Sequence, residues 1–276
     1  MIIIPQISPV ALEIFGFGIR WYALAYIAAF ILGYWTVKKL SRGTLDKKAL
    51  DDLLTYVIIG TIAGGRLGYV LFYNFSYFVS HPLEIFMVWH GGMAFHGGLV
   101  GVILAVFLFA LRRECAVKEG EVSHCKHVEN AFCIFDMLAV AAPIGIFFGR
   151  VANFINMEVM GRATGGPLGV VFAGALDQTP RHASPLYEAM TEGVLLFIIT
   201  LCLWRWTRLR EYPGALASVF LVGYSVFRIF CEFFREPDIQ IGFLTGWGLT
   251  MGMLLSVFMF VGGAVFFAYA IKFGRR

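Results

Sequence analysis

The sequence predicts an all-α, polytopic membrane protein with seven transmembrane helices. Of its 276 residues, 59% are hydrophobic and 14% are charged, and the mean hydropathy is +0.77. A soluble domain carries roughly 45–50% apolar and about 25% charged residues, so a water-soluble globule could not bury this much apolar surface. The lengths of the apolar stretches and the charges between them predict the number and the orientation of the helices.

Seven apolar stretches are long enough to cross a hydrocarbon layer, which takes about 20 helical residues. Each is expected to be helical, because backbone polar groups inside a bilayer must be hydrogen-bonded within their own segment. We expect one membrane domain over residues 1–276, whose first span is permanent because no basic region precedes it as in a signal peptide. The predicted spans are residues 17–37, 53–73, 94–111, 131–155, 187–204, 214–234 and 246–271.

Lys and Arg are distributed unequally between alternate connections. The connections 38–52, 112–130 and 205–213, together with the C-terminal tail, carry 15 Lys and Arg, whereas the other connections and the N-terminal segment carry three. The positive-inside rule therefore places the N-terminus outside and the C-terminus in the cytoplasm, as an odd number of spans requires. This bias also accounts for the net charge of +4, and no basic face remains to suggest a nucleic-acid partner.

A cytoplasmic connection contains Cys115, His124, Cys125, His127 and Cys133, which are the residue types of a zinc site. Their spacing matches no common zinc pattern, so an ordinary polar loop is the favoured interpretation. The sequence predicts neither a metal site nor a cofactor.

Four arginines fall within the predicted spans: Arg20, Arg66, Arg150 and Arg228. An arginine at the centre of a membrane helix costs roughly 2.5–3.5 kcal/mol on insertion scales, so such residues usually face a partner or a wet cavity. With the predicted orientation, all four lie in the outer half of the membrane. Arg20, at the outer end of its span, is expected to reach the lipid headgroups. For Arg66, contact with the headgroups and a place in a functional site are equally compatible with the sequence.

The sixth span carries the clearest polar face. Tyr224, Arg228 and Glu232 follow one another at intervals of four residues, which places them on one side of a helix. An Arg–Glu pair alone could be structural, but a tyrosine in line with it makes a polar stripe that a lipid-facing helix would not carry. We therefore expect this face to line a site.

Polar residues also gather where the fourth span ends. Arg150 and Asn153 share a helical face, and Asn156, Glu158 and Gly161 follow at the membrane boundary. Two amides, a carboxylate and a glycine at this depth predict a helix that unwinds into a binding loop, which a membrane tolerates only around protein or a water-filled cavity.

The third span begins with a glycine-rich segment around His96. His96 is deeper than His90 and is followed by Gly97, so it is the better candidate for a base of the two histidines. Gly97 and Gly101 also form a small-xxx-small step that allows close helix packing.

Arginines in the outer leaflet, with no acidic cluster to neutralise them fully, predict an anionic ligand. Guanidinium groups bind phosphate bidentately, and the anion most available at that depth is a phospholipid headgroup. A transporter or binding protein for anions or anionic lipids is the alternative. Such a transporter is expected to show matching halves with broken helices, and the sequence shows no such halves.

These residues resemble the prolipoprotein diacylglyceryl transferase family of bacteria. The run from Gly149 to Gly161 looks like the complete signature of that family, with no departure from it. Further matches follow the family order from about residue 20 to 240. They are Trp21-Tyr22, Gly91-Gly92-Met93, His96-Gly97-Gly98, and the series Tyr224, Arg228, Glu232, Arg235-Glu236-Pro237.

The resemblance implies a seven-helix enzyme of the bacterial plasma (inner) membrane with a small extracytoplasmic head, part of which residues 156–186 could supply. The implied reaction transfers the diacylglyceryl group of phosphatidylglycerol to the lipobox cysteine in the signal peptide of a preprolipoprotein and releases glycerol phosphate. This is the first step of lipoprotein maturation. The implied partners are therefore phosphatidylglycerol, preprolipoproteins and the surrounding membrane lipid.

For this reaction we expect the arginines to matter more than the base, because a free thiol is already a few per cent thiolate at neutral pH. Arg150 is expected to bind the lipid phosphate, and Arg228, held by Glu232, to stabilise the developing charge. His96, a carboxylate or water could take the thiol proton, and His96 is the candidate we favour. The other expected substrate-binding residues are Tyr22, Arg66, Asn153, Asn156, Glu158, Gly161 and Tyr224.

Overall fold

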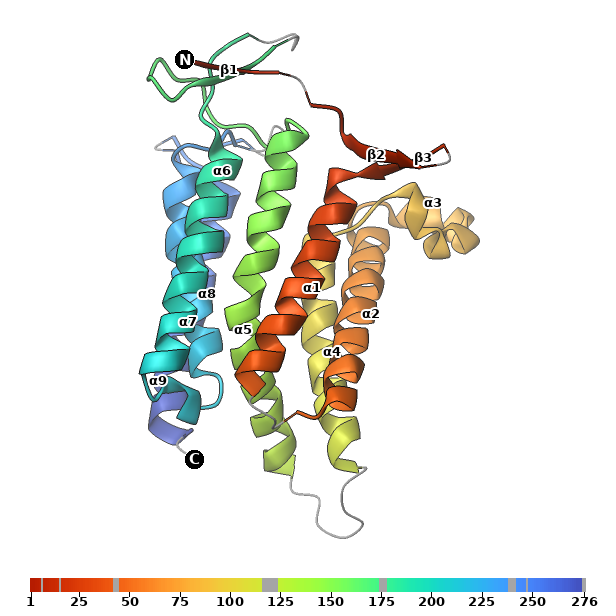
Figure 1. The fold of residues 1–276 in the computed structure, drawn as a ribbon, viewed down its shortest axis with the longest axis vertical. Coiled ribbons are helices and arrows are strands. Elements are labelled where there is room, and N and C mark those ends of the chain that lie inside the picture. The colour runs from red at the N-terminus through yellow and green to blue at the C-terminus, as the bar shows by residue number, and fades with distance from the viewer. Residues whose placement is uncertain are drawn as a thin grey trace. The chain divides into compact units, whose positions relative to one another are not determined.

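The computed structural model describes residues 1–5, 7–14, 16–41, 45–115, 124–173, 178–237, 242–246 and 248–274. The side chains of residues 14, 17, 90, 95, 96, 113–115, 124–129 and 273 lie outside this description. The chain forms two compact units (Figure 1). Met1–Val37 and Asp136–Arg276 make unit 1, and Lys38–Phe135 make unit 2.

Unit 1 consists of membrane-length helices and a few short strands. Figure 1 shows α8 lying beside α7 and α9, with the two chain termini at opposite ends of this unit. Its strands are β1 (Ile2–Ile4), β2 (Val10–Ile14), β3 (Phe17–Arg20) and β4 (Val170–Phe172). Its helices are α6 (Ser184–Glu188), a π-helix (Ala189–Leu195), α7 (Leu196–Trp206), a 3-10 turn (Leu209–Glu211), α8 (Ala215–Glu232) and α9 (Met251–Phe273). Two helices, α1 (Trp21–Ser41) and α5 (His124–Ile155), begin in one unit and end in the other.

Unit 2 is built around two helices, α2 (Lys47–Phe72) and α4 (Phe95–Cys115), which pack along each other. Glycines allow their backbones to come close, since a Cβ atom on Gly60 would lie 2.6 Å from the carbonyl oxygen of Gly101. The small-xxx-small packing predicted for Gly97 and Gly101 is therefore confirmed. The segment of the chain that connects these two helices contains α3 (Phe75–Ser80) and two 3-10 turns, Pro82–Phe86 and Val88–His90.

Helical structure overlaps each of the seven predicted spans, but several boundaries were wrong. The second helix begins at Lys47 rather than residue 53, and the last begins at Met251 rather than residue 246. The first helix begins at Trp21 rather than residue 17, because residues 10–20 form the antiparallel hairpin of β2 and β3. Gly16, with a φ of +82°, supplies the left-handed turn between the two strands. Arg20 accordingly lies exposed at the end of β3 and not within a helix.

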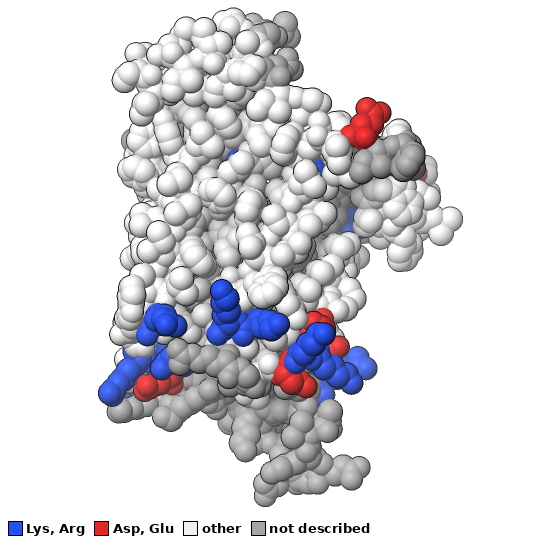
Figure 2. Space-filling model, viewed as in Figure 1, with Lys and Arg blue, Asp and Glu red and all other residues white. Residues whose placement is uncertain are grey.

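Six helices in the described part of the chain are long and apolar enough to cross a membrane: 21–41, 47–72, 130–155, 184–206, 215–232 and 251–272. The apolar helix Gly97–Arg112 is shorter. Large apolar side chains on these helices are exposed, among them Ile59, Phe258 and Val265. Figure 2 shows a broad face that carries almost no Lys, Arg, Asp or Glu. A surface of this kind faces lipid rather than water, so this is a multi-pass membrane protein.

A small β-structured cap is formed in unit 1 by residues 156–173 and 178–183, together with β1. β1 pairs in parallel with β4, in the register Ile2 to Val170. Val170, Phe172 and Ala183 form its core, and Ile4 and Phe154 pack against it. The N-terminal strand therefore ties the cap to the end of α5, where the sequence predicts the binding loop.

Two buried side chains fix helix ends in unit 1. Asp136 on α5 accepts hydrogen bonds from the backbone N–H groups of Gly214 and Ala217, at 2.8 Å each, and so caps the start of α8. Thr250 caps α9 by accepting from Met253 N–H, and its own hydroxyl donates to Glu232 at 3.0 Å. The start of α9 is thereby joined to the polar face of α8.

Candidate active site

The polar face predicted for α8 is present in the structure. Arg228 and Glu232, four residues apart, form an ion pair with 3.0 Å between Nη2 and Oε2. Tyr224 lies one turn before Arg228 on the same helix and stacks on Phe220. The side chain of Arg228 is only 12% exposed, so its charge is balanced by protein groups.

Two carboxylates that the sequence reasoning missed lie beside these arginines. Glu188 places Oε2 2.8 Å from Nε of Arg150, and Oε1 2.9 Å from Nη1 of Arg228. Glu192 lies 3.4 Å from Nη2 of Arg150 and 3.9 Å from Nη1 of Arg228. Both glutamate side chains are fully buried. The expectation that no acidic cluster neutralises the arginines was therefore wrong.

The missed signal was in the sequence. Glu188 and Glu192 stand four residues apart at the start of the predicted span 187–204, where a pair of charges is as unusual as the arginines. In the structure α6 ends at Glu188, and the π-helix that follows contains Glu192. Single π-helical turns are rare and often occur at functional sites.

Together these groups form what we call the arginine–glutamate cluster: Arg150, Arg228, Arg235, Glu188, Glu192 and Glu232. Arg235 joins through Nη1, which lies 3.6 Å from Oε1 of Glu188. The formal charges of the six groups cancel. Removing one partner of a buried ion pair typically costs about 3–5 kcal/mol, because the other charge is left buried without compensation. Loss of a member with short contacts, such as Glu188, is therefore expected to destabilise the site.

The end of α5 explains how the signature residues reach the site. Glu158 N–H bonds to the carbonyl of Asn153, and Met157 N–H bonds to that of Phe154, which is the Schellman pattern of a helix C-terminus. Met157, with a φ of +57°, occupies the left-handed position where glycine is usual. Val159 has the same φ, which is unusual for a β-branched residue. The surrounding structure therefore imposes an unfavourable backbone conformation on both neighbours of Glu158.

Tyr22 on α1 connects this turn to the first helix. Its hydroxyl lies within hydrogen-bonding distance of Oδ1 of Asn153, and 2.5 Å from Oε2 of Glu158. A phenol has one proton, so it donates to only one of the two oxygens at a time. The structure thus brings together three residues that the sequence placed in the site.

Two further signature residues, Asn156 and Gly161, lie near this turn, and the structure explains the identity of the second. Asn156 is the last residue before the turn, and its buried Oδ1 has no hydrogen-bond partner among the described residues. Gly161 forms a β-bridge with Arg235 and donates its N–H to the carbonyl of His182. A Cβ atom on Gly161 would lie 2.5 Å from that carbonyl oxygen and 2.6 Å from that of Phe234, so no larger residue fits.

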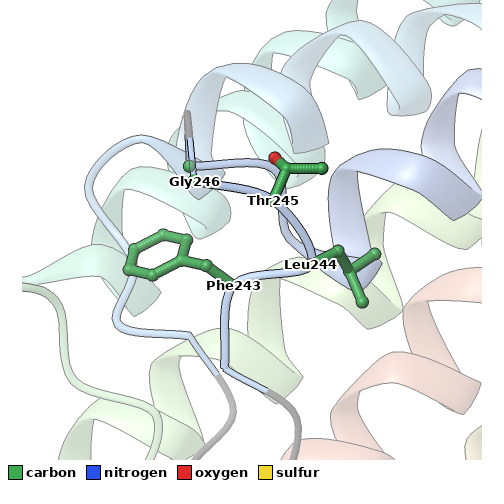
Figure 3. Close-up of a pocket in the computed structure, with 5 residues that line it drawn as sticks. Phe243, Leu244, Thr245 and Gly246 are labelled. Carbon is green, nitrogen blue, oxygen red and sulfur yellow. The ribbon is translucent and has the colours of Figure 1, made fainter.

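Next to the cluster, Arg162 fixes the segment that follows α8. Its guanidinium donates to the carbonyls of Arg235 and Glu232, at 2.8 and 3.2 Å. Its Cζ also lies 5.2 Å from the ring centre of Phe243, in a cation–π contact. Phe243 begins a loop that holds an open pocket of about 600 Å³, and Figure 3 shows the side chains along this loop. The pocket is lined by Phe243, Leu244, Thr245, Gly246 and Gly248.

Arg66 belongs to unit 2, where it is buried among backbone carbonyls. Its five N–H groups donate to the carbonyls of Glu84, Ile85, Met87, Gly91 and Gly92, at 2.5–3.3 Å. A guanidinium has five N–H donors, so each has an acceptor here. These contacts favour an anchoring role for Arg66, and its expected role in substrate binding stays a prediction.

His96 also belongs to unit 2, in the first turn of α4, and its side chain lies outside the described part. Its role as a base stays a prediction. Of the Cys and His residues singled out in the segment 115–133, only Cys133 has a described side chain, and it is a half-buried thiol. Within the described ranges, no group of three or more His, Cys, Asp and Glu is arranged to hold a metal ion.

The cluster has the chemistry to bind an anion, because the guanidinium groups of Arg150 on α5 and Arg228 on α8 both face the carboxylate of Glu188. Arg150 retains 20% side-chain exposure, so a ligand can reach it. A phosphate group would satisfy the planar forks of both arginines, and donors fixed in advance in a water-poor site stabilise charge that develops during a reaction.

Comparisons with known proteins agree with this chemistry. Residues 9–269 match the sequence model of a family described as prolipoprotein diacylglyceryl transferase. A phosphatidylglycerol–prolipoprotein diacylglyceryl transferase of Rhodospirillum rubrum is 49% identical, over 96% of this chain and 93% of the relative. Relatives of the same name from Azospirillum brasilense and Ehrlichia canis are 46% and 42% identical, each over 96% of this chain, and over 95% and 96% of their own lengths.

Proposed function

This chain belongs to the prolipoprotein diacylglyceryl transferase family, and from that membership we propose that it transfers the diacylglyceryl group of phosphatidylglycerol to a prolipoprotein. The acceptor is the thiol of the lipobox cysteine in the signal peptide, and the second product is glycerol phosphate. The observation that carries the proposal is the pair Arg150 and Arg228, held from two helices on the single carboxylate of Glu188.

The reaction is a substitution at the carbon of the diacylglycerol moiety that is bonded to the phosphate oxygen. The cysteine sulfur forms a bond to this carbon, and the bond between the carbon and the phosphate oxygen breaks. Its electron pair stays on the leaving phosphate, while the thiol proton passes to a base. The leaving group therefore gains negative charge in the transition state, and the two arginines stabilise that charge.

The site residues divide this work between binding and orientation. Arg150 binds the lipid phosphate and Arg228 takes up the developing charge, with Glu232 fixing its orientation. Tyr22, Asn153 and Tyr224 orient the headgroup. Asn156, Glu158 and Gly161 form the tight turn and bridge that hold this end of α5 against the cap.

We propose His96 as the base that takes the thiol proton, with a carboxylate or water as the alternatives. His96→Gln keeps the size of the side chain but removes its basicity. We expect thiol-dependent turnover to fall and the pH–rate profile to lose the limb that reports the base. Near-normal turnover in this variant would assign the proton to another group.

We propose seven spans in the bacterial plasma membrane, with the N-terminus outside and the C-terminus in the cytoplasm. Two observations support this topology. The backbone of α4 is helical over Phe95–Cys115, which is long enough for a span. The termini of unit 1 also lie at opposite ends of it, as an odd number of spans requires (Figure 1).

A reconstituted assay tests the function. Purified protein receives phosphatidylglycerol and a lipobox peptide, and glycerol phosphate release is measured, with a Cys→Ser peptide as the control. We expect release that requires the thiol and is lost in Arg150→Ala. A folded wild-type protein that binds the lipid without any release would indicate a lipid-binding or transport protein instead.

A further inference from the structure

The two buried glutamates of the π-helical segment contact the same two arginines in different ways. Glu188 forms a 2.8 Å ion pair with Arg150 and accepts a 2.9 Å hydrogen bond from Arg228. Glu192 accepts a longer hydrogen bond of 3.4 Å from Arg150 and lies 3.9 Å from Arg228. Each glutamate has one oxygen without a hydrogen-bond partner among the described residues, so the two differ in the length of their contacts.

The atoms involved also differ. On Arg150, Glu188 contacts Nε and Glu192 contacts Nη2, whereas on Arg228 both glutamates face Nη1. These Nη groups are the outer ends of the two forks. A phosphate that bridges both arginines would use the same donors, and its negative charge would compete with the carboxylate of Glu192.

We infer that Glu188 is a positioning residue that fixes both arginines throughout the cycle, and that Glu192 is the carboxylate displaced by the substrate phosphate. This inference rests on the proposed function and deepens it. The free site is kept neutral by three carboxylates. When the longer contacts of Glu192 break, Nη2 of Arg150 and the side of Nη1 of Arg228 that faces Glu192 become available to a phosphate mono- or diester, while Arg228 stays paired with Glu188 and Glu232. Glu192 thereby weakens phosphate binding, and it helps to release glycerol phosphate after transfer.

The inference predicts opposite effects for two chemically identical substitutions. Glu192→Gln removes a competing charge from the site, so the Kd for a phosphate ligand is expected to fall about tenfold. Glu188→Gln removes the anchor of both forks, so the same Kd is expected to rise about tenfold and kcat to fall about 100-fold. A purely structural role for both residues would weaken binding in both variants.

Calorimetric titration distinguishes these outcomes. Each variant, together with the wild type and Glu13→Gln as an exposed-carboxylate control, is titrated with glycerol 1-phosphate. Phosphatidylglycerol in nanodiscs forms the second arm, which separates a site for the lipid headgroup from one for free phosphate esters. Tighter binding in Glu192→Gln and weaker binding in Glu188→Gln support the inference in either arm.

Unchanged or weaker binding by Glu192→Gln overturns it. If Glu192→Gln does not fold, Glu192→Asp tests the inference instead. Its shorter side chain lengthens the contacts with Arg150 and Arg228, so the Kd for the phosphate ligand is expected to fall in this variant as well. Wild-type transfer activity, measured on the same preparation, tests the proposed function separately from the competition between Glu192 and phosphate. Tighter binding without any wild-type transfer would remove the proposed function but retain the competition between Glu192 and phosphate.

Discussion

Arg150 on α5 is held by Glu188 on α6 through a contact of 2.8 Å between Nε and Oε2. This contact occupies Nε, and Nη2 makes the longer contact of 3.4 Å with Glu192. A lysine cannot reproduce the arrangement, because its ammonium is a single point charge that cannot bind Glu188 and a phosphate in fixed directions.

Arg150→Lys is therefore expected to raise the KM for phosphatidylglycerol about tenfold or more. The measurement is initial-rate kinetics of glycerol phosphate release over a range of lipid fractions. Arg20→Lys, at the exposed end of β3, is the matched control and is expected to leave the KM unchanged. An unaltered KM in Arg150→Lys would remove the bidentate assignment.

Tyr22→Phe removes the only proton that the phenol gives to Asn153 or Glu158. A hydrogen bond to a charged group contributes about 1.5–3 kcal/mol, so transfer is expected to slow by about 10- to 100-fold. Tyr26→Phe, one turn further along α1, is the control because Tyr26 is 58% exposed. Equal rates for the two variants would show that the phenol of Tyr22 does not orient the site.

Gly161→Ala places a methyl group against the carbonyls of His182 and Phe234. The bridge to Arg235 must then open, and we expect both a lower thermal unfolding temperature and the loss of transfer. Gly165→Ala, in the same cap, is the control because no heavy atom lies within 4 Å of its added Cβ. A Gly161→Ala protein as stable as Gly165→Ala would contradict the packing described for this bridge.

Val159→Gly relieves a left-handed backbone at a β-branched residue. Such strain costs about 1–3 kcal/mol, so the melting temperature is expected to rise in a thermal scan. Val151→Gly, inside α5, is expected to lower it, since glycine weakens a helix interior by about 1 kcal/mol. A lower melting temperature for Val159→Gly would show that the turn is unstrained.

Arg66→Lys leaves at least two of the five carbonyls around the guanidinium without a donor, because an ammonium group has three N–H donors. We expect a lower melting temperature, with an unchanged KM for the lipid in the folded fraction. The opposite pattern, a raised KM at unchanged stability, would place Arg66 in the substrate site.

The sequence alone was sufficient for features that depend on spacing. The alignment of Arg228 with Glu232 follows from helix geometry, and so does the shared face of Arg150 and Asn153. The helices follow from the apolar stretches, which are too long to be anything else in a membrane. The close packing of α2 on α4 could likewise be predicted from the glycines.

Other features depend on how distant segments meet. Glu188 and Glu192 were visible as charges, but their contact with two arginines depends on the packing of α6 against α5 and α8. The five acceptors of Arg66 come from an irregular loop whose path no local pattern specifies. The hairpin before Trp21 was missed because its apolar residues extend the hydrophobic run of α1.

The central claim is that the paired arginines stabilise the leaving phosphate. The most direct measurement is kcat for thiol-dependent glycerol phosphate release by Arg228→Lys at saturating phosphatidylglycerol, beside the wild type. The account predicts a fall of about 100-fold, because a point charge held by Glu188 and Glu232 cannot follow the developing charge. A kcat within about threefold of the wild type would contradict it, because that is less than 1 kcal/mol of transition-state stabilisation.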